Sequence, residues 1–358
     1  MCTTNFYRIT GTKYTIKETN NWEHFTNVGI VDTDKVKIDE VTRDKCGNPI
    51  IIKKLERIPC GNCMECRLNK SKEWAFRCVK EAMEHDNNIM ITLTYDDDHL
   101  PRSRGIDPKT GEIYESSTLV KKDHQDFMKR LRKKFGNDIR FFMCGEYGSD
   151  DEYVDKYGTL RKGTERPHYH FILFNCKFED MKFWRWSKCE WSNQKNALYR
   201  SKTLDKLWGE GHAELNEVNF ETCRYVAGYV AKKYKGSDSK EHYELKGQIP
   251  PYTCMSRKPG IANAFFEKNM EKFFKEQPMW VITKKGMKKA KSRYFDKQME
   301  KVDPERYEEI KEKRKKKADR AWENLLSKTD ITMYQYIENS DSKSEQKNRF
   351  MKMRNKVR

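Results

Sequence analysis

Runs of apolar residues at strand and helix spacing divide the middle of the chain into a few expected elements. Residues 168–174 combine aromatic and β-branched side chains without a breaker, which predicts a strand. Similar runs predict two more strands, over residues 89–95 and 139–146. Apolar residues at helical spacing predict three helices, over about 63–84, 119–135 and 220–236. Between them, residues 101–111 are rich in Gly and Pro and are expected to form a loop.

The predicted strand 168–174 carries two imidazoles on one face. His168 and His170 are two positions apart, so both side chains point the same way. If this strand pairs with strand 139–146 as a hairpin, alternation brings Glu146 to the same face. One carboxylate and two imidazoles leave open positions on a divalent ion and suit Mg²⁺ or Mn²⁺. The alternative is that these are ordinary polar residues at the start of a strand.

The helix expected over 220–236 carries two tyrosines one turn apart. Tyr225 and Tyr229 lie at i and i+4, so both phenols address one site, and Lys233 continues the row at i+8. A tyrosine is a weak nucleophile at neutral pH, so attack on phosphorus requires a Lewis acid at the phosphate and a base or cation near the phenol. Alternatively, tyrosines at this spacing are packing residues. Gly228, between them, either loosens the helix or permits close packing.

Composition narrows the partner and the compartment. The chain has 358 residues, 36% apolar and 36% charged, with a net charge of +18. Such a charge favours a polyanion, most simply nucleic acid. No apolar run has membrane-spanning length, and no secretory signal is apparent. Eleven cysteines, an odd number, argue against a disulfide framework and for an intracellular protein with reduced thiols.

Three cysteines have the spacing of a zinc site. Cys60, Cys63 and Cys66 stand just before the first expected helix. A structural zinc site takes four ligands, and Cys46 is the nearest upstream candidate for the fourth. The other interpretation is that they are small buried residues at a helix start.

Two basic regions leave their roles open. The helix over 119–135 carries Lys129, Arg130, Arg132, Lys133 and Lys134, which either contact phosphates or form a solvated face. Toward the C-terminus, Asp303 and Pro304 mark a helix start, and the charged sequence that follows is typical of a solvated helix or tail.

The histidine, strand and tyrosine motifs together resemble a known family. His168-Tyr169-His170 matches the histidine–hydrophobe–histidine motif of the HUH nucleases. Residues 91–95 (Ile-Thr-Leu-Thr-Tyr) resemble the first motif of rolling-circle replication initiators, and residues 225–233 resemble their tyrosine motif. The three motifs also follow in the family's order.

The resemblance narrows to the replication initiators of microviruses, especially the gokushovirus group, and spans roughly residues 58–265. It rests on five segments, which are Pro-Cys-Gly-Asn-Cys-Met-Glu-Cys-Arg (59–67), Leu-Thr-Tyr-Asp-Asp (93–97), Cys-Gly-Glu-Tyr-Gly (144–148), Arg-Pro-His-Tyr-His (166–170) and Met-Ser-Arg-Lys-Pro-Gly-Ile (255–261).

This resemblance implies a fold and an architecture. The expected fold is α+β, a central antiparallel sheet flanked by helices, with a charged helical C-terminal extension. The expected division is an N-terminal arm of unknown role (1–58), a nuclease domain (59–265) and a basic helical region (266–358).

The resemblance also implies a function. A metal at His168, His170 and Glu146 would assist attack by Tyr225 or Tyr229 on single-stranded origin DNA, with Lys233 nearby, giving a 5′-phosphotyrosine and a free 3′-OH. Replication would start there, with host replication proteins, in the cytoplasm of a bacterial host; the oligomeric state stays open. The alternatives are an HUH transposase or relaxase, and a noncatalytic DNA-binding protein with a cysteine cluster.

Overall fold

A computed structural model describes most of the chain. The described residues are 6–18, 21–32, 36–37, 41–43, 49–51, 54–57, 64–107, 110–148, 152–154, 160–162, 165–188, 195–232, 243–275, 279–283, 286–290 and 292–328. They fall into two compact units. One comprises Met1–Asn69 and Asp319–Arg358, and the other comprises Lys70–Ala318.

The first unit contains a small antiparallel sheet in which β2, β1 and β3 are neighbours and β6 also pairs with β1. A separate pair joins β4 and β5. The strands of this unit are β1 (Phe6–Glu18), β2 (Asn21–Asp32), β3 (Val36–Lys37), β4 (Val41–Arg43), β5 (Pro49–Ile51) and β6 (Lys54–Arg57).

The second unit is built on a seven-stranded sheet. Every recorded pairing in it is antiparallel, which confirms the expected α+β architecture. In spatial order its strands are β14 (Lys182–Lys188), β15 (Lys195–Arg200), β16 (Gly211–Glu217), β7 (Asn88–Tyr95), β13 (Pro167–Phe174), β10 (Arg140–Tyr147) and β17 (Tyr252–Met255). The three strands expected from the sequence, β7, β13 and β10, are adjacent at its centre.

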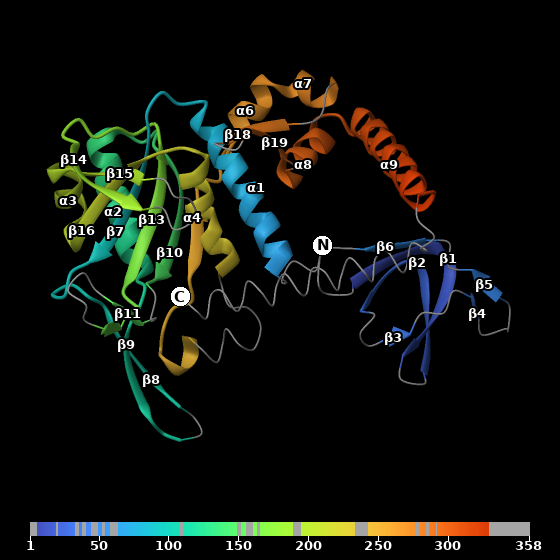
Figure 1. Ribbon diagram of the computed structural model, residues 1–358, viewed down its shortest axis with the longest axis horizontal. Helices are drawn as coiled ribbons and strands as arrows, with labels where there is room; N and C mark the ends of the chain where they lie inside the picture. Colours follow the sequence, from blue (N-terminus) through green and yellow to red (C-terminus); the bar gives the residue numbers. More distant parts are fainter. Residues whose placement is uncertain are drawn as a thin grey trace. The chain divides into compact units, whose positions relative to one another are not determined.

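Helices cover the two faces of this sheet (Figure 1). On one face, α2 (Lys121–Phe135) and α3 (Lys202–Trp208) pack against the side that carries Tyr169, Phe171 and Leu173. On the other, α1 (Met64–Ala82) and α4 (Phe220–Lys232) pack against the side that carries Ile172 and Phe174. The alternation expected for β13 is therefore confirmed, because its odd and even positions fall into separate cores.

Further helices pack around Phe76 of α1 in a third cluster. They are α6 (Asn263–Lys268), α7 (Met270–Lys275), α8 (Arg293–Val302) and α9 (Pro304–Leu326). Asp303 caps α9, accepting the backbone N–H of Arg306 at 3.0 Å, as the Asp-Pro pair predicted. The region expected to be helical also contains a hairpin of β18 (Met279–Thr283) and β19 (Gly286–Ala290). The three-part division of the chain stays a prediction.

The expected loop over 101–111 is wrong in its first half. Residues Arg102–Ile106 form β8, which pairs with β9 (Ile113–Ser117). The backbone of residues 245–247 lies directly against this hairpin, so that a Cβ on Gly105 would lie 1.8 Å from the carbonyl oxygen of Leu245. Gly105 thus permits a contact between distant segments, which local sequence does not reveal. A shorter pair joins β11 (Glu152–Val154) and β12 (Leu160–Lys162).

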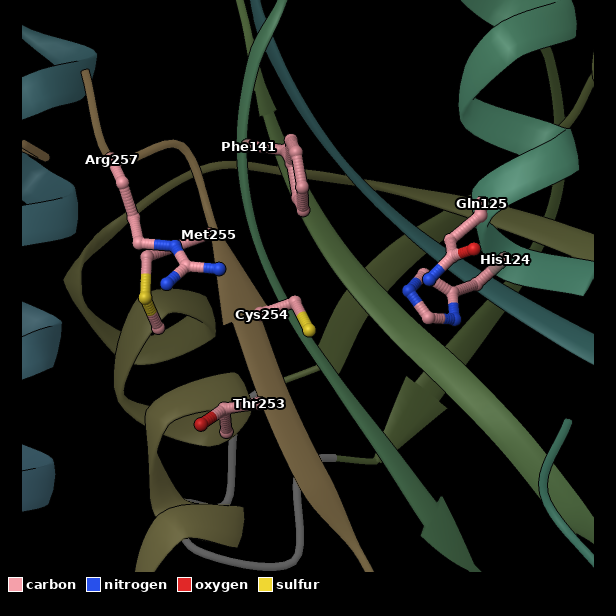
Figure 2. Close-up of a pocket in the computed structure, with 7 residues that line it drawn as sticks. All are labelled: His124, Gln125, Phe141, Thr253, Cys254, Met255 and Arg257. Carbon is pink, nitrogen blue, oxygen red and sulfur yellow. The ribbon is translucent and has the colours of Figure 1, made fainter. Parts of the chain in front are cut away.

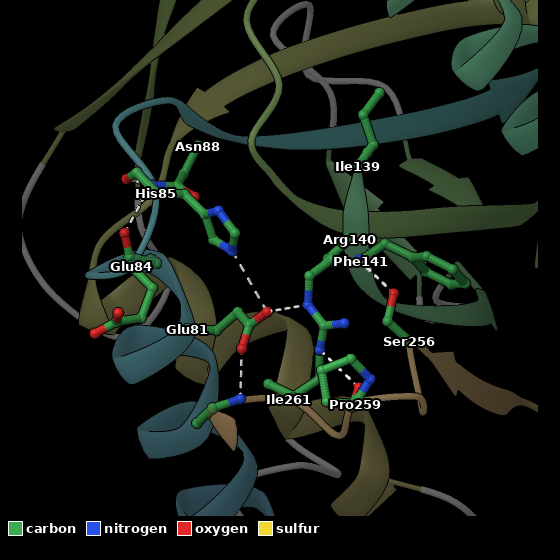
Figure 3. Close-up of polar contacts among 12 residues, drawn as sticks. Glu81, Glu84, His85, Asn88, Ile139, Arg140, Phe141, Ser256, Pro259 and Ile261 are labelled. Carbon is green, nitrogen blue, oxygen red and sulfur yellow. Dashed lines mark hydrogen bonds and ion pairs between the residues drawn. The ribbon is translucent and has the colours of Figure 1, made fainter. Parts of the chain in front are cut away.

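The motif at 255–261 forms the turn after the edge strand β17, and buried charges hold it (Figure 3). Arg140 bonds the carboxylate of Glu81 and donates to the carbonyl oxygens of Pro259 (2.8 Å) and Gly260 (3.1 Å). Glu81 also accepts the backbone N–H of Ala262. The motif therefore fastens the sheet edge to α1.

No helix in the described part of the chain has the length and apolar character that a membrane span needs.

Candidate active site

The pairing of β10 with β13 brings the predicted ligands together. Glu146 lies directly opposite His168 in the ladder, and His170 lies opposite Cys144, so all three ligands share one face. Glu146 Oε1 is 2.9 Å from His168 Nε2 and 3.2 Å from His170 Nε2. The expected meeting of carboxylate and imidazoles is present in the structure.

The other ring nitrogens fix the orientation of both imidazoles. His168 Nδ1 donates to the carbonyl oxygen of Arg166 at 3.0 Å, and His170 Nδ1 bonds Thr92 Oγ1 at 2.9 Å. Both Nε2 atoms consequently face the carboxylate, the arrangement in which metal-binding histidines are usually held. The sequence analysis gave Thr92 no role. Its position opposite His170 in the β7–β13 ladder reveals that role.

The carboxylate is ionised at neutral pH. Burial by itself would raise the pKa of Glu146, but hydrogen bonds from His168 and His170 and the charges of these imidazoles outweigh burial and hold the pKa at about 2. A buried negative charge flanked by two neutral-capable nitrogen donors is suited to a cation.

These three side chains fit a divalent ion. Their ligand atoms all lie within 4.8 Å of one another, and among the described residues they are the one group of this kind. An ion between them would replace two N–H···O bonds by three metal–ligand bonds, with further positions open. Two nitrogens and one carboxylate oxygen are compatible with Mn²⁺ or Mg²⁺.

Both tyrosines of α4 reach the same imidazole. The Tyr229 ring stacks on His170 with centroids 5.0 Å apart, and the Tyr225 ring meets it edge-on at 5.2 Å. Tyr225 is 36% exposed and Tyr229 only 5%. Burial, and next the charge of Glu146, raise the pKa of the Tyr229 phenol. Lys233, the third expected member of this row, lies outside the described residues.

The local sequence explains the position of this helix. Asn219 Oδ1 accepts the backbone N–H of Thr222 at 2.9 Å, and Thr222 Oγ1 accepts that of Asn219 at 2.8 Å, a reciprocal cap that starts α4. Val226 and Ala227 are buried on the sheet, which turns the tyrosine row towards the histidines. A Cβ built on Gly228 meets nothing within 4 Å, so close packing does not account for this glycine.

The basic positions of α2 lie on the face of the sheet opposite the histidines. Arg130 donates to the carbonyl oxygens of Leu207 (2.7 Å) and Trp208 (2.9 Å), which fastens α3. Lys129 pairs with Asp126 at 2.9 Å, and Arg132 donates to Ile139 at 3.3 Å. These contacts, and the location of α2, favour the interpretation of a solvated face.

Other candidate features lie away from this site. Of the three cysteines expected for zinc, Cys60 and Cys63 lie outside the described residues, and Cys66 is a buried free thiol; the zinc site stays a prediction. A pocket of about 370 Å³ surrounds the edge strand β17 and contains none of the predicted site residues (Figure 2). Its lining residues are His124, Gln125, Phe141, Thr253, Cys254, Met255 and Arg257.

Comparison with known proteins points to one family. The model of the family of replication-associated proteins of the ORF2 type matches residues 88–234, which include the three ligands and both tyrosines. No solved structure gives a significant match.

Individual relatives cover more of the chain. Replication-associated protein ORF2 of Spiroplasma virus 4 is 30% identical over 304 residues, 84% of this chain and 82% of its own. Replication-associated protein VP4 of Bdellovibrio phage phiMH2K is 29% identical over 260 residues, 73% of either chain. Replication-associated protein ORF4 of Chlamydia phage 1 is 32% identical over 185 residues, 49% of this chain and 38% of its own. The chain therefore belongs to the family of phage replication-associated proteins, the initiators of rolling-circle replication.

Proposed function

We propose that this replication initiator nicks and rejoins single-stranded DNA by metal-assisted tyrosine attack. The observation that carries the proposal is the contact of both Tyr225 and Tyr229 with His170, whose Nε2 faces Glu146. Two phenols and one set of metal ligands then address a single phosphate.

The ligands and the tyrosines have distinct roles in this proposal. Glu146, His168 and His170 hold a divalent ion, with Thr92 and the carbonyl of Arg166 orienting the imidazoles. When bound, the ion acts as a Lewis acid on the oxygens of the scissile phosphate.

One phenol oxygen forms a bond to phosphorus while the bond from phosphorus to the 3′-oxygen breaks. The phenol proton ends on that 3′-oxygen, which leaves a 5′-phosphotyrosine and a free 3′-OH as primer for replication. The second tyrosine repeats the attack at the regenerated origin, and the first 3′-OH reseals the strand by displacing its tyrosine. Because each transfer keeps a phosphodiester, no ATP is consumed.

The difference in exposure assigns an order. Tyr225 is 36% exposed and Tyr229 is 5% exposed. An incoming strand meets the Tyr225 phenol first, so we assign the first attack to Tyr225 and the resolving attack to Tyr229. The substrate is the single-stranded origin, in the host cell and beside host replication proteins.

The test is covalent capture. The purified chain is incubated with single-stranded origin oligonucleotides carrying a label on either the 5′ or the 3′ side of the nick, with Mn²⁺ or with chelator. We expect an SDS-stable adduct that retains the 3′-side fragment and needs the metal. Retention of DNA without any adduct would favour a noncatalytic DNA-binding protein. An adduct that uses one tyrosine throughout would favour a transposase-like reaction.

A further inference from the structure

The face of the sheet that holds the metal ligands continues beyond them. His170 lies opposite Thr92 of β7, and Thr92 lies opposite Glu214 of β16. Directly opposed residues in an antiparallel ladder point to the same side. The face that carries the proposed active site therefore extends across β16 towards β15 and β14.

A tryptophan flanked by two arginines lies on this extension. Arg185 of β14 donates to Glu214 at 3.0 Å, which places its side chain on the same face. The guanidinium carbons of Arg200 and Arg185 lie 4.4 and 5.0 Å from the ring centroid of Trp184. Both distances are within the range of cation–π contact. Trp184 is nevertheless 48% exposed.

No helix of the second unit is recorded over this part of the face in the described residues. The helix that contacts β16 is α3, whose Leu204 and Trp208 pack on the opposite side, in the core with Leu215. On the active-site side, α4 contacts β10 and β13 instead. An exposed tryptophan beside cations, on an open sheet, is the chemistry that stacks bases of single-stranded nucleic acid while neutralising its phosphates.

Strand spacing gives the reach. From β13 to β14 the sheet order has four steps, and at about 4.8 Å per step the separation is roughly 19 Å. At about 3.4 Å per stacked nucleotide this corresponds to roughly six nucleotides, and fewer in an extended strand. An origin strand with its scissile phosphate at the ligands is thus long enough to reach Trp184.

We propose that Trp184, with Arg185 and Arg200, forms a stacking subsite for bases of the single-stranded DNA that flank the scissile phosphate. The inference rests on the proposed function. It adds a residue that contacts substrate far from the reacting phosphorus, and it predicts that the bound strand crosses β7, β16 and β15.

The chain offers a matched control on the same strand. Trp186 is 59% exposed, but it pairs with Ala197 and its ring contacts Phe183, which contacts Tyr199. Tyr199 packs in the core on the other side of the sheet. Trp184 and Trp186 are therefore similar residues on opposite faces.

The first experiment measures binding by fluorescence anisotropy with a 20-nucleotide oligothymidylate in chelator, so that no cleavage occurs. Trp184→Ala should weaken binding about tenfold, Trp184→Phe should weaken it less, and Trp186→Ala should stay within about twofold of the unaltered protein. Equal losses in Trp184→Ala and Trp186→Ala, or no loss in Trp184→Ala, would overturn the proposal.

The second experiment needs no variant. The unaltered protein is crosslinked by ultraviolet light to the same oligonucleotide containing 5-bromodeoxyuridine, and digested with trypsin. Cleavage after Lys182, Arg185 and Lys188 separates the two tryptophans into peptides 183–185 and 186–188. A crosslink in 183–185 is expected, and one confined to other peptides would overturn the proposal. A protein that forms the crosslink but no covalent tyrosine adduct with Mn²⁺ would contradict the proposed function and leave the subsite standing.

Discussion

Tyr229 stacks almost parallel on His170, with the two ring planes 6° apart and the centroids separated by 5.0 Å. His170 is at the same time 3.2 Å from Glu146 through its Nε2 atom. One imidazole therefore contacts both the proposed nucleophiles and the proposed metal-binding carboxylate. Changes at this imidazole should affect metal affinity and covalent chemistry together.

Loss of either histidine should remove metal binding and nicking but retain most DNA binding, because phosphate contacts elsewhere supply most of the affinity. We expect His168→Ala and His170→Ala each to weaken Mn²⁺ binding at least about tenfold by calorimetry, with no detectable adduct. His99→Ala is the control, since His99 is exposed and pairs with Asp96 instead. Normal nicking by the double variant after treatment with chelator would refute the site.

Thr92 should matter through His170 alone. Thr92→Val keeps the β-branched shape but removes the hydroxyl that bonds Nδ1. We expect Mn²⁺ affinity to fall by about 10- to 100-fold, with Thr92→Ser restoring most of it. Calorimetric titration measures both variants. Unchanged affinity in Thr92→Val would show that this hydrogen bond does not orient the imidazole for metal.

Neutralising exposed lysines of α2 should leave the salt dependence of single-stranded DNA binding unchanged. Lys133 and Lys134 are exposed on the helix that covers the face opposite His170. If they contacted phosphates, changing both to Gln would lower the slope of log affinity against log salt by about 1.4. A decrease of that size in anisotropy titrations would place DNA on α2.

Gly228→Ala should stabilise α4 by up to about 1 kcal/mol, because alanine is the better helix former and its Cβ meets no neighbour. If the glycine loosens the helix so that each tyrosine can move, the first adduct should form normally while repeated strand transfer slows. Urea unfolding and a multiple-turnover assay measure the two effects. Faster or unchanged repeated transfer in the stabilised variant would exclude that role.

Much of the fold was predictable because its signals are local. Alternation in β13 and the spacing of Tyr225 and Tyr229 each depend on one element, and the opposition of Glu146 and His168 followed from one assumed hairpin. Partners that are distant in sequence were not predictable. Thr92 and His170 are 78 residues apart, and Arg130 looked like a solvated cation because its acceptor Leu207 is 77 residues away.

The strands β14, β15 and β16 show the same limit. A polar and aromatic sequence such as that of β14 does not indicate which strand it joins or which face Trp184 occupies. A shift by one residue turns every side chain to the other face, and the irregular register between Phe183 and Arg185 does this locally. The position of Trp184 beside Arg200 therefore follows only from the assembled sheet.

The central claim is that the tyrosines of α4 are the nucleophiles. Phe at either position removes the phenol oxygen but keeps the ring that contacts His170, so the fold should survive. We expect Tyr225→Phe to lose most of the first adduct. Tyr229→Phe should form the first adduct and fail in repeated transfer.

The most direct measurement is therefore SDS-stable adduct formation by the Tyr225→Phe/Tyr229→Phe double variant, with single-stranded origin DNA and Mn²⁺. The account predicts DNA binding close to that of the unaltered protein and no adduct at all. Undiminished adduct in the double variant would contradict the account and place the nucleophile on another residue.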